Sequence, residues 1–130
     1  MYVNKKVCVI IPAKDEQPSI GLVVGALKKL RFIHQPLIDE IIVCDNGSQD
    51  QTAQTAREAG AKVVYQPTMG YGIACLTAMK ALPEDCDIVL FIDGDHAFDA
   101  EQCFDLLAGM ADGAVMVIGS RVLGARERGA

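Results

Sequence analysis

The sequence predicts a three-layer α/β sandwich with a mostly parallel sheet. Short apolar runs recur along the chain, as expected for parallel strands that are covered on both faces. Segments with the apolar spacing of helices alternate with these runs, and this alternation is typical of strand–helix–strand units with right-handed crossovers. With 130 residues, 51% of them apolar, the chain is long enough for one folded domain.

The first strand is expected over residues 7–11, which form an uninterrupted apolar run. Pro18 suits the first turn of a helix that reaches about Leu30. One face of this helix carries an apolar stripe, formed by Ile20, Val23, Val24 and Leu27. The start of the chain is therefore interpreted as a strand followed by a helix and not as a secretion signal.

The middle of the chain repeats the same pattern. Residues 38–44 predict a second strand, and Asp50 is expected to cap the helix that follows, with Gly60 as its C-cap. Residues 62–65 predict a short third strand, and residues 72–81 predict a third helix.

The last part of the chain adds two strands and one helix. Residues 88–92 form another apolar run and predict a buried strand. Asp99, with Gln102 three residues later, resembles a capping box for a helix through Met110. Residues 115–118 predict the fifth strand of the sheet.

Composition excludes several classes of function. The net charge is −5, and no block of Lys and Arg is longer than a pair, which argues against a nucleic-acid surface. No segment approaches the 18 apolar residues of a membrane span. The five cysteines are odd in number, scattered and without C-x-x-C spacing, which argues against a disulfide framework or a zinc site and favours a cytoplasmic location.

Polar clusters follow the predicted strands, at the sheet edge where open α/β sheets bind ligands. After the first strand, a predicted helix N-terminus would offer N–H groups to an anion, although Asp15 and Glu16 could equally be first-turn acids that favour the helix dipole. After the second strand, Asp45 could accept hydrogen bonds from a nucleotide, or it could belong to a turn built on Asn46-Gly47. Gly70 precedes the third helix and could let the backbone approach a phosphate, or only start the helix tightly.

The segment 93–95 is the most informative of these clusters. Asp93 and Asp95 end a buried strand one residue apart, and two like charges so close disfavour each other's ionisation. A divalent cation removes this cost, and we expect Gly94 to let the backbone turn so that both carboxylates converge. The alternative is a solvated acidic turn before the next helix. His96 is a further candidate ligand, although a lone histidine beside a turn is more often incidental.

The final cluster follows the fifth predicted strand. Arg121 could hold a phosphate through its planar guanidinium group. Residues 121–130 are Arg-rich and lack apolar periodicity, so we expect a solvated tail there.

Five segments taken together resemble the nucleotide-binding half of the GT-A fold, a Rossmann-like fold, in family 2 glycosyltransferases. They are VIIPAKDE, IIVCDNGSQDQT, GYGIA, FIDGDHAFD and VIGSR, in that order along the chain. Within the family, the chain is most similar to dolichyl- or polyprenyl-phosphate sugar synthases. Two residues depart from the family pattern, because Asn46 stands where a second Asp is usual and Gly94 where Ala is commoner.

The resemblance implies a nucleoside-diphosphate sugar as donor, linked to UDP or GDP, and a polyprenyl phosphate as an acceptor. It implies Mg²⁺ or Mn²⁺ as the cofactor, bound by Asp95 with Asp93. The residues that it implies for donor binding are Pro12, Ala13, Glu16, Asp45, Gly70, Asp93 and Arg121. No residue matches a motif for the catalytic base, which inverting sugar transfer requires.

The resemblance also sets an expectation for domain organisation. Residues 1–120 are expected to form the donor-binding half-domain, with the acceptor half absent. An incomplete fold would expose apolar surface, so we expect a homo-oligomer. The alternative function is a non-catalytic binding or assembly module of the same fold, completed by another chain or by self-association. An unrelated nucleotidyltransferase is disfavoured, because the loop PAKDEQPS lacks the glycines and basic residues expected there.

Overall fold

The computed structural model describes residues 1–95, 99–111 and 117–119. Strands and helices alternate along most of the chain, as predicted. In chain order the elements are β1 (Val7–Ala13), α1 (Gln17–Lys28), β2 (Arg31–Phe32), β3 (Gln35–Pro36), β4 (Glu40–Asp45), α2 (Thr52–Ala59), β5 (Lys62–Tyr65), α3 (Tyr71–Met79), β6 (Ile88–Ile92), α4 (Gln102–Ala111) and β7 (Val117–Gly119).

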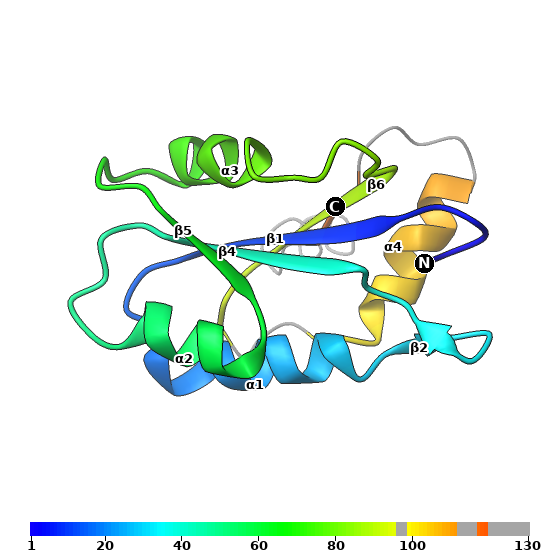
Figure 1. The fold of residues 1–130 in the computed structure, drawn as a ribbon, viewed down its shortest axis with the longest axis horizontal. Helices are drawn as coiled ribbons and strands as arrows, with labels where there is room; N and C mark the ends of the chain where they lie inside the picture. The colour runs from blue at the N-terminus through cyan, green and yellow to red at the C-terminus, as the bar shows by residue number, and fades with distance from the viewer. Residues whose placement is uncertain (96–98, 112–116, 120–130) are drawn as a thin grey trace, which may run out of the picture.

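The main sheet has five strands in the order β5-β4-β1-β6-β7, and every pairing in it is parallel. Helices cover the sheet on both faces, with α3 on one side and α1 and α2 on the other (Figure 1). This arrangement confirms the predicted three-layer α/β sandwich.

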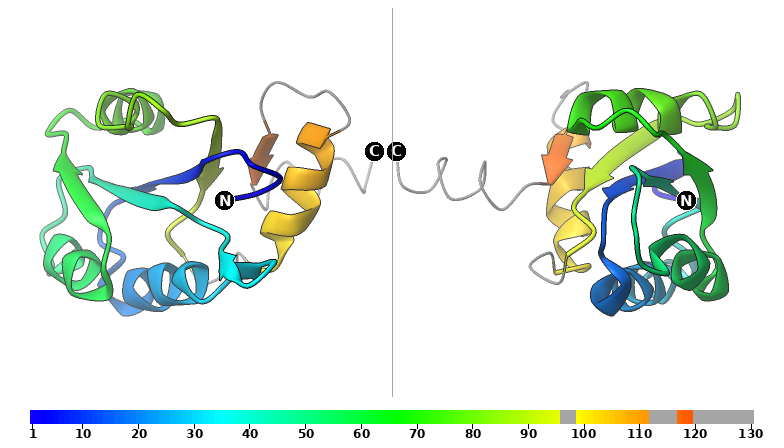
Figure 2. Two further views of the ribbon diagram at one scale, coloured as in Figure 1. Left: turned by 45° about the vertical axis from the view of Figure 1, so that its right-hand side comes forward. Right: turned by 90° about the vertical axis from the view of Figure 1, so that its left-hand side faces the viewer.

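The side chains of β1 alternate between two cores. Val9 and Ile11 pack in the larger core with residues of α1, α2 and α4, whereas Ile10 packs in the smaller core beneath α3. The position of α3 follows from the direction of the chain. From β1 the chain moves in one direction across the sheet, first to β4 and then to β5. The connection through α3 runs in the reverse direction, from β5 to β6 on the other side of β1. Because the crossovers have the same hand, α3 lies on the face of the sheet opposite to α1 and α2 (Figure 2).

One local prediction differs from the structure. α2 begins at Thr52 and its N-cap is Gln51, so Asp50 is not the N-cap residue, although its Oδ1 accepts from Thr52 N, the first N–H of the helix, at 3.0 Å. Gly60 closes α2 with φ 106°, as predicted. The fifth strand is β7, and residues 115 and 116 of the predicted strand lie outside the described residues.

The antiparallel pair β2–β3 was not predicted. Its turn places Ile33 at φ 51° and His34 at φ 65°, a conformation that a β-branched residue rarely adopts. Because neither residue is a glycine, the sequence contains no turn signal at this point.

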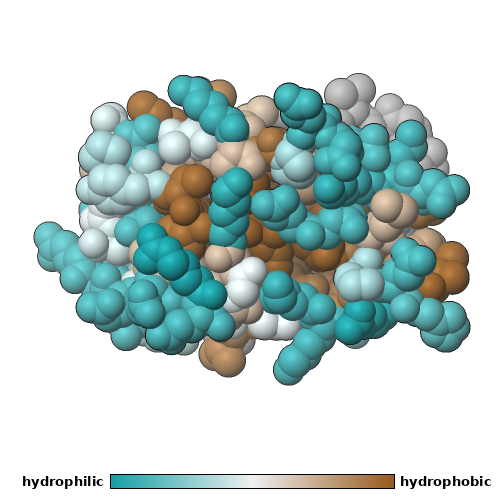
Figure 3. Space-filling model, in the orientation of Figure 1, coloured by the Kyte–Doolittle hydropathy of each residue, from teal (hydrophilic) through white to brown (hydrophobic). Residues whose placement is uncertain are grey.

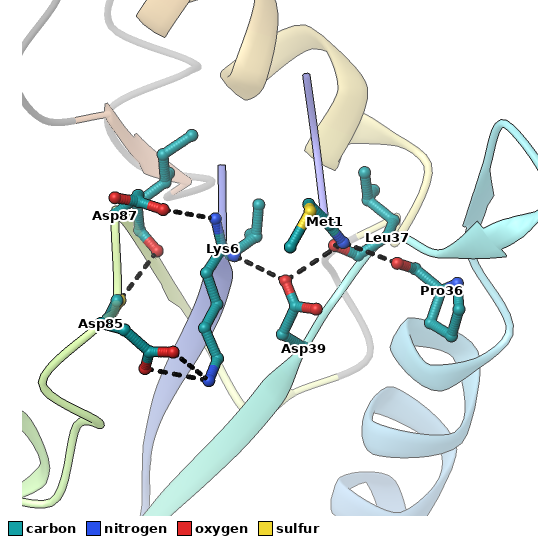
Figure 4. Close-up of polar contacts among 10 residues, drawn as sticks. Met1, Lys6, Pro36, Leu37, Asp39, Asp85 and Asp87 are labelled. Atoms are coloured by element: carbon teal, nitrogen blue, oxygen red, sulfur yellow. Dashed lines mark hydrogen bonds and ion pairs between the residues drawn. The ribbon is translucent and has the colours of Figure 1, made fainter. Parts of the chain in front are cut away.

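Ion pairs and hydrogen bonds stabilise the amino-terminal edge of the sheet, where the parallel strands begin (Figure 4). Lys6 Nζ lies 3.0 Å from Asp85 Oδ1, and the amino group of Met1 lies 3.1 Å from Asp39 Oδ2. The hydrogen bond with Lys6 lowers the pKa of Asp85 and raises the pKa of Lys6. These exposed contacts fasten the chain start to β4 and to the segment before β6, and each contributes little stability alone.

Candidate functional site

The candidate site lies at the carboxyl edge of the sheet, around the end of β1. β1 pairs with β4 as far as Ala13 and Asp45, but its pairing with β6 ends at Ile10 and Phe91. β1 is also the strand at which the chain order reverses, because its two neighbours are reached in opposite directions. Ligands of open α/β sheets bind at this kind of position.

The turn at residues 93–95 folds back onto β1. Gly94 is buried, and Asp93 and Asp95 on either side are partly exposed. A Cβ on Gly94 would lie 3.3 Å from Ile11 Cγ2 and 3.4 Å from both Ala13 Cβ and Ile20 Cδ1. The backbone of Gly94 is not in the left-handed region. Gly94 therefore does not use a left-handed conformation to turn the backbone here, and it packs closely against β1 and α1.

Ser19 connects this turn to α1. Its hydroxyl lies 2.9 Å from Gly94 O and 3.2 Å from Glu16 Oε2. A hydroxyl has one proton to donate, and the shorter contact makes the Gly94 carbonyl the better acceptor. Glu16 thus lies beside the acidic turn, as the site assignment requires. Ser19 was not singled out from the sequence, because its partner is 75 residues away.

The loop before α1 is fastened to the loop before α2. Three successive backbone N–H groups at the start of α1 donate to side chains of the second loop. These bonds join Asp15 N to Ser48 Oγ (2.9 Å), Glu16 N to Thr52 Oγ1 (2.9 Å) and Gln17 N to Asp50 Oδ2 (3.2 Å). The prediction that this helix N-terminus offers free N–H groups to an anion is therefore wrong. These three N–H groups are not available to a ligand.

Bonds in the other direction complete this loop zipper, which we define as the hydrogen bonds between residues 15–17 and 48–52. Gln49 N donates to Asp15 Oδ1 at 2.7 Å, and Gln51 N donates to Gln17 Oε1 at 3.0 Å. Asp50 accepts from both the hydroxyl and the backbone N–H of Thr52, and the hydroxyl bond is the largest cause of its lowered pKa. Asp15 is therefore mainly a structural acceptor.

Asp45 and Asn46 are the buried polar residues at the end of β4, exposed by 8% and 7%. Asp45 Oδ1 accepts from Ser48 N at 2.9 Å, which closes a turn around Gly47 at φ 83°. Asn46 donates from Nδ2 to Gln66 O and to Thr68 O, both at 2.8 Å. The positive φ predicted for the Asn46-Gly47 turn is thus confirmed at Gly47.

The start of α3 borders the same region. Gly70 is the N-cap of α3 with φ 145°, and its N–H donates to Asn46 Oδ1 at 3.0 Å. Tyr71 follows and is 53% exposed, and desolvation, with the nearby Cys75 and Asp93, raises its pKa to about 12. Tyr71 therefore lies near the acidic turn, and nothing in the sequence pattern identified it.

The structure brings together six of the seven residues assigned to donor binding, namely Pro12, Ala13, Glu16, Asp45, Gly70 and Asp93. The seventh, Arg121, lies outside the described residues, as does His96. Two cavities, of about 300 and 380 Å³, lie at the other edge of the sheet, beside residues 1–4 and 31–39. Neither cavity contains a residue assigned from the sequence.

The donor set at the acidic turn can be tested against a metal ion. Asp93 and Asp95 supply hard carboxylate oxygens, which suit Mg²⁺ and Mn²⁺. Within the described part of the chain, no group of three or more His, Cys, Asp or Glu residues could hold an ion alone. The residues therefore fit a cation that takes its remaining ligands from a bound diphosphate or water.

No helix among the described residues is long and apolar enough to cross a membrane.

Comparisons with known proteins identify the family of this chain. Residues 8–129 match the family model described as Glycosyl transferase family 2. Protein RfbJ of Shigella flexneri is 34% identical over 122 residues, which cover 93% of this chain and 89% of RfbJ. A dolichyl-phosphate hexose transferase of Haloferax volcanii is 29% identical over 121 residues, which cover 93% of this chain and 50% of that protein.

Solved structures share the fold. Glucosyl-3-phosphoglycerate synthase of Mycobacterium tuberculosis, in complex with Mn²⁺, UDP and glucosyl-3-phosphoglycerate, matches with a TM-score of 0.68 and 30% identity. The match covers 83% of this chain and 40% of that one. The same enzyme has been solved with Mg²⁺ and UDP. The family resemblance inferred from the five segments is confirmed, and the chain belongs to glycosyl transferase family 2.

Proposed function

We propose that this chain binds a nucleoside-diphosphate sugar together with Mg²⁺ or Mn²⁺, as the donor-binding part of a glycosyltransferase. The observation that carries the proposal is the convergence of the ends of β1, β4 and β6 with the start of α3. These segments carry the motifs that the family shares, and they are far apart in the sequence.

Each assigned residue has a role in this proposal. Pro12, Ala13 and Asp45 border the base and ribose, where Ala13 and Asp45 are paired across β1 and β4. Asp93 contacts the ribose or the diphosphate, and Asp95 ligates the cation with it. Glu16, Gly70 and Arg121 complete the surroundings of the sugar diphosphate. No residue is assigned as the catalytic base.

The cation would neutralise negative charge on the nucleoside-diphosphate leaving group as the bond between this group and the sugar breaks. The chain's own contribution is to hold the two carboxylates at the end of a buried strand. Gly94 packs tightly against β1 and α1, and Ser19 fixes its carbonyl. A carboxylate pair fixed in this way needs little reorganisation to bind a cation.

The relatives support a proposal for the donor base and for the acceptor. UDP is bound by the solved glucosyl-3-phosphoglycerate synthase, which favours UDP over GDP for this chain. A polyprenyl phosphate is the proposed acceptor, supported by the similarity to a dolichyl-phosphate hexose transferase. We also propose a cytoplasmic location, which the odd number and the scattered positions of the five cysteines support.

Calorimetric titration tests the proposed function directly. UDP and GDP are titrated into the protein with Mn²⁺ and with EDTA. We expect binding of UDP that depends on Mn²⁺ and is lost in Asp95→Ala, with Asp87→Ala as a control at the opposite edge of the sheet. If neither nucleotide binds, the donor-binding proposal is wrong.

The second candidate function is an assembly module of the same fold, completed by self-association or by another chain. A specific observation favours it, because α3 carries no charged residue and exposes apolar side chains. Ile73 is 37% exposed, Leu76 is 59% exposed and Met79 is 39% exposed. Apolar atoms also show along the upper edge of the molecule, where α3 lies (Figure 3). A surface of this kind is typical of an interface.

A further inference from the structure

Asn46 uses its whole side chain within the protein. Its Nδ2 group donates to Gln66 O and Thr68 O at 2.8 Å, and its Oδ1 accepts from Gly70 N at 3.0 Å. All three partners are backbone groups of the segment between β5 and α3. The residue is 7% exposed, and its own N–H donates to Ala13 O at 2.9 Å. Asn46 is therefore built into the fold between two elements of the candidate site.

The segment that Asn46 holds, residues 66–70, spans the site. Near the C-terminal end of the segment, Met69 Sδ lies 3.4 Å from Lys14 Nζ, which follows β1. Gly70, the next residue, is the N-cap of α3, where Tyr71 lies near Asp93. The same segment is fastened to α3 by Gln66 Nε2, which donates to Thr77 Oγ1 at 2.7 Å. Residues 66–70 therefore border the candidate site between the end of β1 and the start of α3.

We propose that Asn46 is a positioning residue for donor binding, which holds residues 66–70 in place and must be an amide to do so. The inference rests on the proposed function. An amide has two N–H donors and one carbonyl acceptor, and all the bonds observed use this set. An ionised carboxylate has only acceptors, so at this position it would face two carbonyl oxygens and repel them.

The structure and the family resemblance give opposite expectations for one substitution. Family 2 members usually carry a second Asp where this chain has Asn46, so Asn46→Asp would restore the usual residue and strengthen nucleotide binding. The hydrogen bonds of this chain indicate the reverse. Burial and the two facing carbonyls would raise the pKa of the new carboxyl, and its protonated form would regain one donor. The loss of nucleotide affinity in Asn46→Asp should therefore be smaller at low pH than at high pH.

The experiment measures UDP affinity in the presence of Mn²⁺ for the wild type, Asn46→Asp and Asn4→Asp, at about pH 8 and about pH 5.5. Asn4 is exposed at the opposite edge of the sheet, so Asn4→Asp makes the same chemical change away from the site. We expect Asn46→Asp to weaken binding about tenfold at the higher pH, from the loss of buried hydrogen bonds. At the lower pH, the UDP affinity of Asn46→Asp should be closer to that of the wild type. Asn4→Asp should have the wild-type affinity at both pH values.

A second variant keeps the inference testable if Asn46→Asp does not fold. Asn46→Ser retains one donor and introduces no charge. It should therefore weaken UDP binding by the same factor at both pH values. Hydrogen exchange without ligand should show faster exchange of residues 66–70 in Asn46→Ser than in the wild type, with unchanged exchange in β1.

The outcomes separate the two proposals. If the wild type does not bind UDP, the proposed function fails and the role of Asn46 in donor binding fails with it, whereas the exchange of residues 66–70 still shows whether Asn46 holds that segment in place. If the wild type binds and Asn46→Asp binds equally or more tightly at the higher pH, the positioning role is overturned. Unchanged exchange of residues 66–70 in Asn46→Ser would overturn it as well.

Discussion

At the scale of single residues, the site depends on groups that are already engaged within the fold. Ser19 fixes the carbonyl of Gly94, and Asn46 fixes the segment before α3. Neither residue is expected to touch the donor. The residues proposed to do so, such as Asp45 and Asp93, stand next to these fixed groups in sequence. Preorganisation of this kind reduces the cost of ordering side chains when a ligand binds.

Gly94 gives a prediction at this scale. Gly94→Ala should lower the free energy of unfolding by about 1 kcal/mol, because its Cβ would press on Ile11, Ala13 and Ile20. Gly25→Ala is the matched control, since a Cβ there meets nothing within 4 Å in the middle of α1 and should raise stability by about 0.5–1 kcal/mol. Urea denaturation measures both. Equal changes in the two variants would contradict the packing explanation.

At the scale of elements, the loop zipper couples the starts of α1 and α2. The first turns of these helices bond to each other's loops, and this cross-bonding replaces ordinary capping within each helix. Ser19 of α1 also donates to Gly94 O in the acidic turn. The loop zipper therefore holds the loop that follows β4 in a fixed position relative to the acidic turn. Two neighbouring helices therefore act as one support for the site.

Asp50 provides the test of the loop zipper. Asp50→Ala removes the acceptor of Gln17 N and of Thr52, and we expect a lower melting temperature than that of the wild type. Glu84→Ala removes an exposed carboxylate between α3 and β6 and should change stability little. Thermal denaturation of both variants is the measurement. If Asp50→Ala has the same melting temperature as Glu84→Ala, the loop zipper does not stabilise the fold as proposed.

The sequence was sufficient for the elements whose signal is local. The apolar runs of β1, β4 and β6 and the apolar stripe of α1 were all predicted, because burial on the sheet faces dictates those patterns. The β2–β3 hairpin was missed, because its turn uses Ile33 and His34 in a conformation that glycine usually provides.

For the site, the sequence predicted which strand ends meet but not how they are fastened. The topology alone brings Asp45 and Asp93 to one edge of the sheet. The engagement of the α1 N-terminus by Ser48 and Thr52 depends on bonds across more than 30 residues, which no local pattern encodes. The same applies to the role of Asn46, whose bonding partners are backbone atoms.

At the scale of the whole molecule, buried thiols set the response of stability to alkaline pH. Burial raises the pKa of Cys8 and Cys103 to about 12 and that of Cys44 to about 11, from an ordinary value of 9.0. In the unfolded chain these thiols ionise above that ordinary value, whereas in the folded chain they stay protonated. The unfolded state therefore loses protons first, and folding stability falls as pH rises from 9 towards 12.

The prediction is a lower urea midpoint at about pH 10 than at about pH 8. Cys103→Ala should show a smaller decrease between the two pH values, because one of the buried thiols is gone. An unchanged midpoint in the wild type would contradict this assignment of the buried thiols.

The exposed face of α3 makes a second prediction at this scale. We expect the protein to self-associate through α3, and Leu76→Lys should shift it to the monomer by placing a charge in the apolar contact. Ile33→Lys alters an apolar residue that is 75% exposed at the β2–β3 turn, on the other side of the molecule, and should leave the mass unchanged. Light scattering after size exclusion measures the mass. A wild-type monomer at every concentration would exclude this interface.

The central claim is that Asp93 and Asp95 bind a divalent cation together with a nucleoside diphosphate. Electron paramagnetic resonance of Mn²⁺ tests it most directly, because the signal of the free aqueous ion falls when the ion is bound. We predict that protein and UDP together lower the free signal well below the level given by UDP alone, and that Asp95→Ala abolishes this additional decrease. A free Mn²⁺ signal equal to that of UDP alone, in the presence of the wild-type protein, would contradict the account.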